Sequence, residues 1–173
     1  MIYFIEGCTC AGKSTLAKQI IEEKQIPLAP EHTPAPLNET PSIVERQQLL
    51  FADFVSQFTS MIASKKDYVA DFSPWGVIPF SMAYASFLKK NDPQNKEADL
   101  LQDMAFQQHK FMLEFKATFK EHLTCLKYLQ GDSNVIWARL ADRNRKGDNC
   151  WQREFIEILV IQYNKYFAAF FGE

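Results

Sequence analysis

Short apolar runs alternate with longer segments of helical periodicity along this chain. The runs predict β-strands over residues 2–5, 26–29, 68–70 and 123–129. The periodic segments predict helices over residues 14–24, 42–63, 77–90, 98–122, 133–142 and 152–171. Because strands alternate with helices, we predict an α/β fold with a central parallel sheet of four to five strands flanked by helices.

Aromatic side chains recur at helical spacing in the second half of the chain. Residues 98–122 carry Phe111, Phe115 and Phe119 at four-residue intervals. The last predicted helix has large side chains on one side, which are Phe155, Leu159, Tyr163, Tyr166 and Phe170. Such stripes are usually buried in a core, but they also suit contact with a second subunit. A homodimer is therefore one expectation.

Proline and polar residues interrupt the pattern over residues 30–41, which contain four prolines and are predicted to form a loop. Long loops are often functional. Glu31 stands at the start of this loop, where the second predicted strand ends. Parallel α/β folds bind ligands at the carboxyl edge of the sheet, so Glu31 is a candidate site residue.

Composition and charge narrow the class of protein. The 173 residues are 47% hydrophobic and carry a formal net charge of −2, which predicts one folded domain over residues 1–173. The acidic balance disfavours stable nucleic-acid binding. No apolar stretch is long enough to cross a bilayer, and no basic segment precedes an apolar run at the N-terminus. We therefore expect a cytoplasmic protein with no membrane partner.

A glycine-rich motif of the form GxxxxGKS lies between the first predicted strand and the first predicted helix. With the next hydroxyl residue its members are Gly7, Cys8, Thr9, Cys10, Ala11, Gly12, Lys13, Ser14 and Thr15. In a strand–loop–helix context this pattern indicates a phosphate-binding P-loop. The glycines let backbone N–H groups approach phosphate oxygens, Lys13 supplies a positive charge, and the Ser14 hydroxyl suits Mg²⁺. We predict that a nucleoside triphosphate and Mg²⁺ bind here.

Two of the four cysteines, Cys8 and Cys10, lie within this motif. The sequence has no second pair of closely spaced cysteines, so a four-ligand zinc site is disfavoured. We expect small buried thiols in a reducing compartment. A second hypothesis is that the helix N-terminus lowers the thiol pKa and makes the loop sensitive to oxidation.

Three further features bear on the fate of the γ-phosphate. Asp71 ends the third predicted strand, where a carboxylate can hold Mg²⁺, although an Asp before Ser-Pro also suits a plain turn. Arg139, Arg143 and Arg145 can close over a triphosphate, or can form a solvated basic helix end. Glu31 can accept a proton from an attacking hydroxyl, or can remain a solvated loop acid.

These residues, in this order, resemble the deoxynucleoside kinases and the related thymidylate kinases. The resemblance rests on the P-loop, on Glu31 eighteen residues after Lys13, on the acidic-x-Ser triplet that begins at Asp71, and on the arginines after the fourth predicted strand. It implies a P-loop kinase fold with an arginine-bearing lid at approximately residues 143–150. It also implies ATP as phosphate donor and Mg²⁺ as cofactor.

The resemblance further implies roles for single residues. Lys13 and Ser14, with the loop amides, would hold the ATP phosphates and Mg²⁺. Glu31 would be the general base, Asp71 would lie near Mg²⁺, and the three arginines would form the lid. The acceptor pocket would lie along residues 42–63, and its candidate base-reading or base-stacking residues are Arg46, Asp53, Phe54, Gln57, Phe58 and Phe72.

Three features depart from the family pattern. Phe72 stands where the family has arginine, which removes one positive charge from the reaction centre. The chain stops after its last predicted helix, where the family usually adds a strand. The segment around Glu31 lacks the arginine with which thymidylate kinases bind a monophosphate. This favours a nucleoside acceptor, while Arg46 keeps a nucleotide acceptor open.

The leading hypothesis is an ATP-dependent deoxynucleoside kinase that transfers the γ-phosphate to a 5′-hydroxyl. The alternatives are a deoxynucleoside monophosphate kinase, a small kinase for another metabolite, and a non-catalytic nucleotide-binding module. A GTPase is disfavoured because no Asn-Lys-x-Asp motif follows a predicted strand. The acidic net charge disfavours a kinase that acts on DNA ends.

Overall fold

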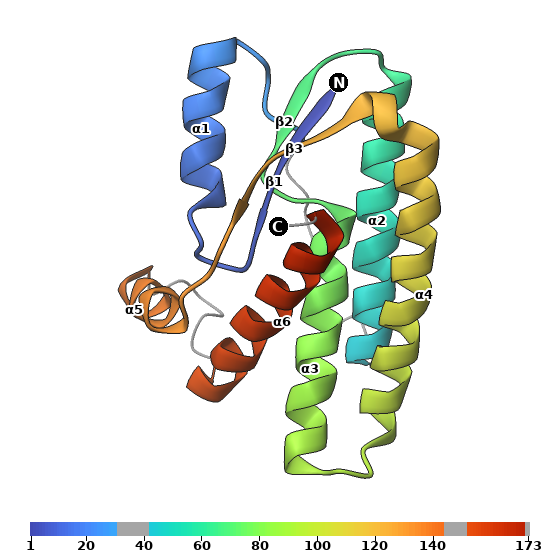
Figure 1. Ribbon diagram of the computed structural model, residues 1–173, viewed down its shortest axis with the longest axis vertical. Helices are drawn as coiled ribbons and strands as arrows, with labels where there is room; N and C mark the ends of the chain where they lie inside the picture. The colour runs from blue at the N-terminus through green and yellow to red at the C-terminus, as the bar shows by residue number, and fades with distance from the viewer. Residues whose placement is uncertain (31–41, 144–151, 172–173) are drawn as a thin grey trace.

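The computed structural model describes residues 1–30, 42–143 and 152–171, and it centres on a parallel sheet (Figure 1). Within these residues the sheet has three strands in the order β2–β1–β3, with β1 at Ile2–Gly7, β2 at Tyr68–Ala70 and β3 at Leu123–Leu129. Both β2 and β3 run parallel to β1. The prediction of an α/β fold around a parallel sheet is confirmed.

The segment at residues 26–29 is not a strand, and here the prediction is wrong. It forms an isolated parallel bridge between Leu28 and Val69, in which the Ala29 N–H donates to Val69 O at 2.7 Å. Pro27 has no N–H to donate, and Pro30 ends the pairing on the other side. The described residues therefore give three strands and one bridge in place of the four to five strands expected.

The helices of the described residues lie close to their predicted ranges. They are α1 Lys13–Lys24, α2 Ile43–Ala63, α3 Val77–Asn91, α4 Lys96–Phe119, α5 Ser133–Arg143 and α6 Arg153–Phe171. Short 3-10 turns, Pro74–Gly76 and Lys120–His122, lie before α3 and after α4. Side-chain caps fix several starts: Ser42 accepts from the Glu45 N–H at 3.2 Å, and Asp132 accepts from the Val135 N–H at 3.0 Å.

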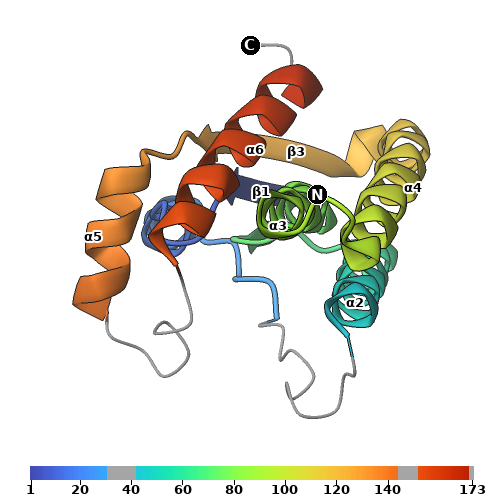
Figure 2. The ribbon, with the colours of Figure 1, turned by 90° about the horizontal axis from the view of Figure 1, so that it is seen from below.

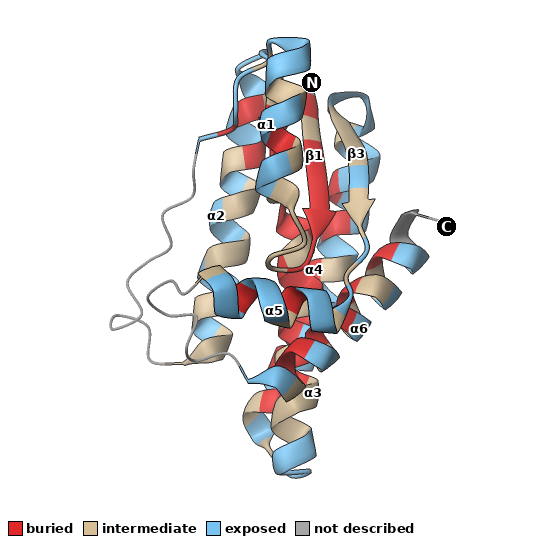
Figure 3. Cartoon of the chain, turned by 90° about the vertical axis from the view of Figure 1, so that its left-hand side faces the viewer, coloured by how far each residue is buried: buried red, intermediate tan, exposed pale blue. Residues whose placement is uncertain are grey.

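The helices form layers on the two faces of the sheet (Figures 1 and 2). A small core that includes Ile5, Ala17 and Val69 joins α1 to one face. The larger core lies on the other face beneath α2, α3, α4 and α6, and Trp75 is buried there with its ring stacked on Phe4 at 5.1 Å. Figure 3 shows that buried residues run along β1. The sheet is therefore held between two apolar layers, and its carboxyl edge carries the connecting loops.

The aromatic stripes pack largely as core. On α4, Phe115 is buried and Phe119 is half-buried, whereas Phe111 is exposed and meets Phe51 of α2 edge-on at 6.0 Å. On α6, Phe155, Leu159 and Tyr163 are all buried in the larger core. None of the helices in the described residues combines the length and apolarity that a membrane span requires.

Candidate active site

The P-loop begins where β1 ends. Gly7 has a φ of +150°, and Gly12, directly before α1, has a φ of +102°. Cys10 between them also has a positive φ of 56°, and the Ala11 N–H donates to Cys8 O at 3.3 Å. The backbone thus turns tightly from β1 into the N-terminus of α1, the arrangement that binds phosphate groups in other proteins.

Gly7 has no room for a side chain. A Cβ there would lie 2.8 Å from the backbone oxygen of Leu129 on β3, at a φ that residues with a side chain rarely adopt. We expect Gly7→Ala to displace the loop and to weaken binding of a non-hydrolysable ATP analogue about tenfold or more, measured by calorimetry. Equal affinity for wild type and Gly7→Ala would contradict this account of the loop.

Lys13 is the first residue of α1, and its side chain turns back onto the loop. The ammonium donates to Gly7 O at 2.6 Å and to Cys8 O at 2.9 Å. Burial lowers the pKa of Lys13 from its ordinary 10.5, and the nearby Glu6 carboxylate opposes this shift. The cation is therefore already held within the loop that phosphates would occupy.

Ser14 and Asp71 are brought together at the carboxyl edge of the sheet. The Ser14 hydroxyl donates to Asp71 Oδ2 at 2.6 Å, although the residues are 57 apart in sequence. Both offer oxygen atoms, which Mg²⁺ prefers, so this pair fits the predicted metal. The described residues contain no cluster of three or more His, Cys, Asp or Glu that could hold a metal ion. Phosphate oxygens and water would have to complete the coordination.

Arg139 reaches the P-loop from α5. Its guanidinium donates to Cys10 O at 3.0 Å. Arg143 lies four residues further along and ends α5, on the same side of the helix. Arg145, Glu31 and all of the expected lid beyond Arg143 lie outside the described residues. The structure thus places Arg139 on the loop.

Sequence reasoning missed Glu6, which is 2% exposed at the end of β1. Its carboxyl group accepts a hydrogen bond from the Ser73 hydroxyl. Burial raises the pKa of Glu6 from 4.5 to about 8, and both the charge of Lys13 and a hydrogen bond from the Gly7 N–H oppose the shift. The available signal was an acidic residue that follows an apolar strand directly and precedes the first glycine of the motif.

The thiol of Cys8 is buried next to the site. Burial raises the pKa of Cys8 to about 11, although the charge of Lys13 acts in the opposite direction. The hypothesis that the helix N-terminus lowers this pKa is therefore wrong for Cys8, because loss of solvent is the larger effect.

The predicted acceptor-pocket residues lie in different environments. Along α2, Asp53 is exposed, whereas Arg46 and Gln57 are half-buried. Phe54 and Phe72 stack on each other with ring centroids 4.8 Å apart. Phe72, at the position of the family arginine, thus makes an aromatic contact with α2 at the end of β2.

Two buried glutamines were also missed. Gln47 of α2 is 3% exposed and Gln108 of α4 is 6% exposed. Within the described residues, Gln47 Oε1 and both amide atoms of Gln108 lack a hydrogen-bond partner. The contact between Phe51 and Phe111, one turn further along each helix, shows that α2 and α4 touch at this level. Buried amides without partners often mark bound water or ligand. Sequence alone could not separate Gln47 from its neighbour Gln48, because the helical phase decides which is buried.

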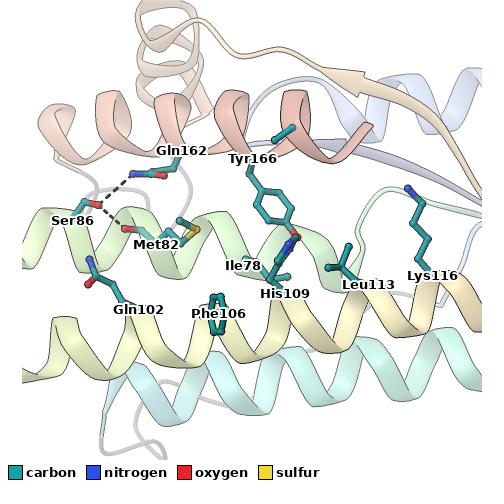
Figure 4. Close-up of a pocket in the computed structure, with 11 residues that line it drawn as sticks. Ile78, Met82, Ser86, Gln102, Phe106, His109, Leu113, Lys116, Gln162 and Tyr166 are labelled. Carbon is teal, nitrogen blue, oxygen red and sulfur yellow. Dashed lines mark hydrogen bonds between the residues drawn. The ribbon is translucent and has the colours of Figure 1, made fainter. Parts of the chain in front are cut away.

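A second concave region lies between α3, α4 and α6, and its lining shares no residue with the P-loop (Figure 4). This groove has a volume of about 660 Å³. Phe106 and Leu113 of α4 line it and are 65% and 48% exposed. His109 and Tyr166, joined at 3.1 Å, lie between α4 and α6. The groove is mainly apolar, unlike the polar P-loop.

No protein-family model matches the sequence, and no curated protein sequence matches it. Solved structures of deoxyadenosine kinase from M. mycoides are similar to it. The structure with bound dCTP has a TM-score of 0.64 at 15% identity, over 100% of this chain and 86% of that chain. The structure with the products dCMP and a flexible dCDP has a TM-score of 0.63 at 16% identity, over 98% and 84%. The structure with dATP has a TM-score of 0.55 at 16% identity, over 99% and 86%. At this identity the likeness shows the fold alone: the chain has the α/β fold of these deoxyadenosine kinases.

Proposed function

We propose that this chain is an ATP-dependent deoxynucleoside kinase that transfers the γ-phosphate of ATP to the 5′-hydroxyl of a deoxynucleoside. The observation that carries the proposal is the contact between Ser14 and Asp71 at 2.6 Å. It places a hydroxyl and a carboxylate, both suited to Mg²⁺, beside the loop that holds Lys13. The likeness in fold to deoxyadenosine kinases supports this choice over other P-loop activities.

In this proposal the P-loop holds the donor. Its backbone amides bind the ATP phosphates, and Lys13 exchanges its bonds to the Gly7 and Cys8 carbonyls for phosphate oxygens. Ser14 and Asp71 would hold Mg²⁺, which offsets negative charge on the phosphates. The loop thereby fixes the γ-phosphate next to Asp71.

The acceptor hydroxyl attacks the γ-phosphorus in line with the leaving group. Glu31 accepts the hydroxyl proton as the new oxygen–phosphorus bond forms, and the bond to the bridging oxygen breaks to release ADP. Arg139, Arg143 and Arg145 neutralise the charge on the transferred group. Of these residues Arg139 already contacts the loop, through Cys10 O.

The acceptor base lies along α2 in this proposal, with Arg46, Asp53, Phe54, Gln57 and Phe72 as its candidate contacts. The buried amide of Gln47 is a further candidate, because an amide can both donate to and accept from the edge of a base.

Replacing Gln47 with leucine should raise KM for the acceptor about tenfold, because the hydrogen bonds of a buried amide to its ligand are lost. KM for ATP should stay within about twofold. Steady-state kinetics with each substrate varied in turn measure both. Gln48→Leu is the matched control, since Gln48 is the exposed neighbour. A rise in KM for ATP equal to that for the acceptor would place Gln47 outside the acceptor pocket.

We further propose that the chain forms a homodimer through the groove between α3, α4 and α6. Exposed Phe106 and Leu113 lie seven residues apart on one side of α4 and line this groove, so two copies related by a twofold axis could bury each other's apolar side chains.

Phe106→Glu should then give a monomer where wild type gives a dimer, measured by light scattering after gel filtration. Leu100→Glu, on the exposed part of α4 outside the groove lining, should remain dimeric. A dimer that survives Phe106→Glu would contradict the proposal.

The test of the proposed function separates nucleoside from nucleotide acceptors. Purified protein is incubated with Mg²⁺ and γ-labelled ATP and with single deoxynucleosides or deoxynucleoside monophosphates. Deoxycytidine and deoxyadenosine come first, because the similar kinases were solved with nucleotides of these two bases. Label on a deoxynucleoside supports the proposal. Label only on monophosphates supports the monophosphate kinase, and tight ATP binding without transfer supports the non-catalytic module.

A further inference from the structure

Glu6 links the strand of the P-loop to the turn after β2. Its carboxyl group lies at the end of β1, directly before Gly7, and is 2% exposed. Ser73 donates its hydroxyl hydrogen to this carboxyl group from 67 residues away. The same Ser73 oxygen accepts from the Trp75 N–H at 3.2 Å and so starts the 3-10 turn. One hydroxyl therefore joins the strand to the turn.

The surroundings leave the carboxyl group little freedom. A Cβ built on Gly76 would lie 3.3 Å from Glu6 Oε2 and 3.9 Å from Oε1, so the carboxyl group lies against this glycine. Tyr163 of α6 holds the glycine in place, since its hydroxyl donates to Gly76 O at 2.6 Å. The carboxyl group of Glu6 is thus fixed by the turn and, through it, by α6.

The turn held in this way also carries Asp71. Asp71 stands two residues before Ser73 and accepts the hydrogen bond of Ser14 at 2.6 Å. Movement of the turn relative to β1 would therefore move Asp71 away from Ser14. We propose that Glu6 is a positioning residue for phosphoryl transfer, which holds the turn from Asp71 to Ser73 against the strand that carries the P-loop. The proposal rests on the proposed function.

The protonation state of Glu6 suits this role. Burial raises its pKa to about 8, so at neutral pH the carboxyl group is mostly uncharged and can accept from Ser73 without placing an anion beside bound phosphates. Glutamine has the same shape and no charge, so a glutamine at position 6 should keep the hydrogen bond from Ser73. An alanine at this position should lose it. The titratable groups that act electrostatically with Glu6 are Lys13, Tyr128, Tyr163 and Tyr166, and Cys8 in turn acts on Lys13.

The kinetic test compares Glu6→Ala, Glu6→Gln and Ser73→Ala with the control Ser81→Ala. Ser81 is a matched control, because its hydroxyl is also buried but bonds to Val77 O at 3.0 Å within α3. We expect Glu6→Ala and Ser73→Ala each to lower kcat about tenfold or more, with KM for ATP within about twofold. The double variant should be no worse than either single one, because both remove one contact.

Glu6→Gln should keep kcat within about threefold of wild type at pH 7, and Ser81→Ala should leave it unchanged. A kcat that is kept in Glu6→Gln and lost in Glu6→Ala would indicate loss of the hydrogen bond rather than a general loss of packing. Equal losses for Ser73→Ala and Ser81→Ala, or losses that add in the double variant, would overturn the proposal.

A fluorescence titration tests the contact without relying on activity. Trp75 belongs to the turn, and its ring stacks on Phe4 of β1 at 5.1 Å. With Trp137 and Trp151 replaced by phenylalanine, Trp75 emission should change with a midpoint near pH 8. Glu6→Gln should abolish the change. Lys13→Met should move the midpoint upward, because the charge of Lys13 opposes the raised pKa of Glu6.

An unchanged transition in Glu6→Gln would overturn the proposal, since another group would then be titrating. If no acceptor is phosphorylated, the proposed function fails by itself. The emission of Trp75 in Glu6→Ala and Ser73→Ala, compared with Glu6→Gln and Ser81→Ala, would still decide whether Glu6 and Ser73 hold the turn.

Discussion

Replacing Lys13 with alanine is expected to lower kcat/KM for phosphoryl transfer by about 1,000-fold. The ammonium lies within the P-loop, 2.6 Å from Gly7 O and 2.9 Å from Cys8 O, where the outer phosphates would bind. In the proposed mechanism its removal takes away one of the cations that offset the negative charge of the transferred phosphate. Steady-state kinetics with ATP and the preferred acceptor measure the effect.

Lys18→Ala is the matched control for this experiment. Lys18 lies on α1 as well, but it is exposed and five residues beyond Lys13. We expect its kcat/KM within about twofold of wild type. A loss of less than about tenfold in Lys13→Ala would show that the cation does not act on the transferred phosphate.

The second large effect concerns the dependence of stability on pH. The pKa of Glu6 is about 8 in the folded chain against an ordinary 4.5, so the folded state binds this proton more tightly than the unfolded state. The stabilisation is complete below pH 4.5 and is lost as the pH rises through 8. Wild type should therefore lose about 3 kcal/mol of unfolding free energy relative to Glu6→Gln between about pH 6 and pH 9.

Urea unfolding of both proteins at several pH values measures this difference. Other titrating groups, including Lys13, are present in both proteins, so the comparison removes much of their contribution. The profile of Glu6→Gln should be the flatter of the two in this range. Parallel profiles would mean that Glu6 is ionised in the folded chain at neutral pH.

Sequence predicted best where a local pattern decides the structure. The motif from Gly7 to Thr15 and the flanking β1 and α1 follow from neighbouring residues alone. The proximity of Ser14 and Asp71 could be predicted from the sequence, because both residues follow the ends of adjacent parallel strands. The strand predicted around Leu28 was wrong. The apolar residues of this segment suggested a strand, but its prolines limit the pairing with β2 to one bridge.

The missed residues depend on tertiary contacts. In the sequence Glu6 is only the residue that follows an apolar run. The fold shows that Ser73 donates to its carboxyl group and that Gly76 lies against it. Gln47 differs from Gln48 by helical phase, which packing against α4 settles. Phe72 stays a predicted pocket residue, and its stacking on Phe54 of α2 is a tertiary contact that the sequence alone does not predict.

The central claim is that the P-loop and its Ser14–Asp71 pair bind a triphosphate together with Mg²⁺. Calorimetric titration with a non-hydrolysable ATP analogue, with and without Mg²⁺, tests this most directly. We predict that Mg²⁺ tightens binding to wild type about tenfold or more and that Ser14→Ala loses most of this gain. Affinity that is the same with and without Mg²⁺, and the same in wild type and Lys13→Ala, would contradict the claim.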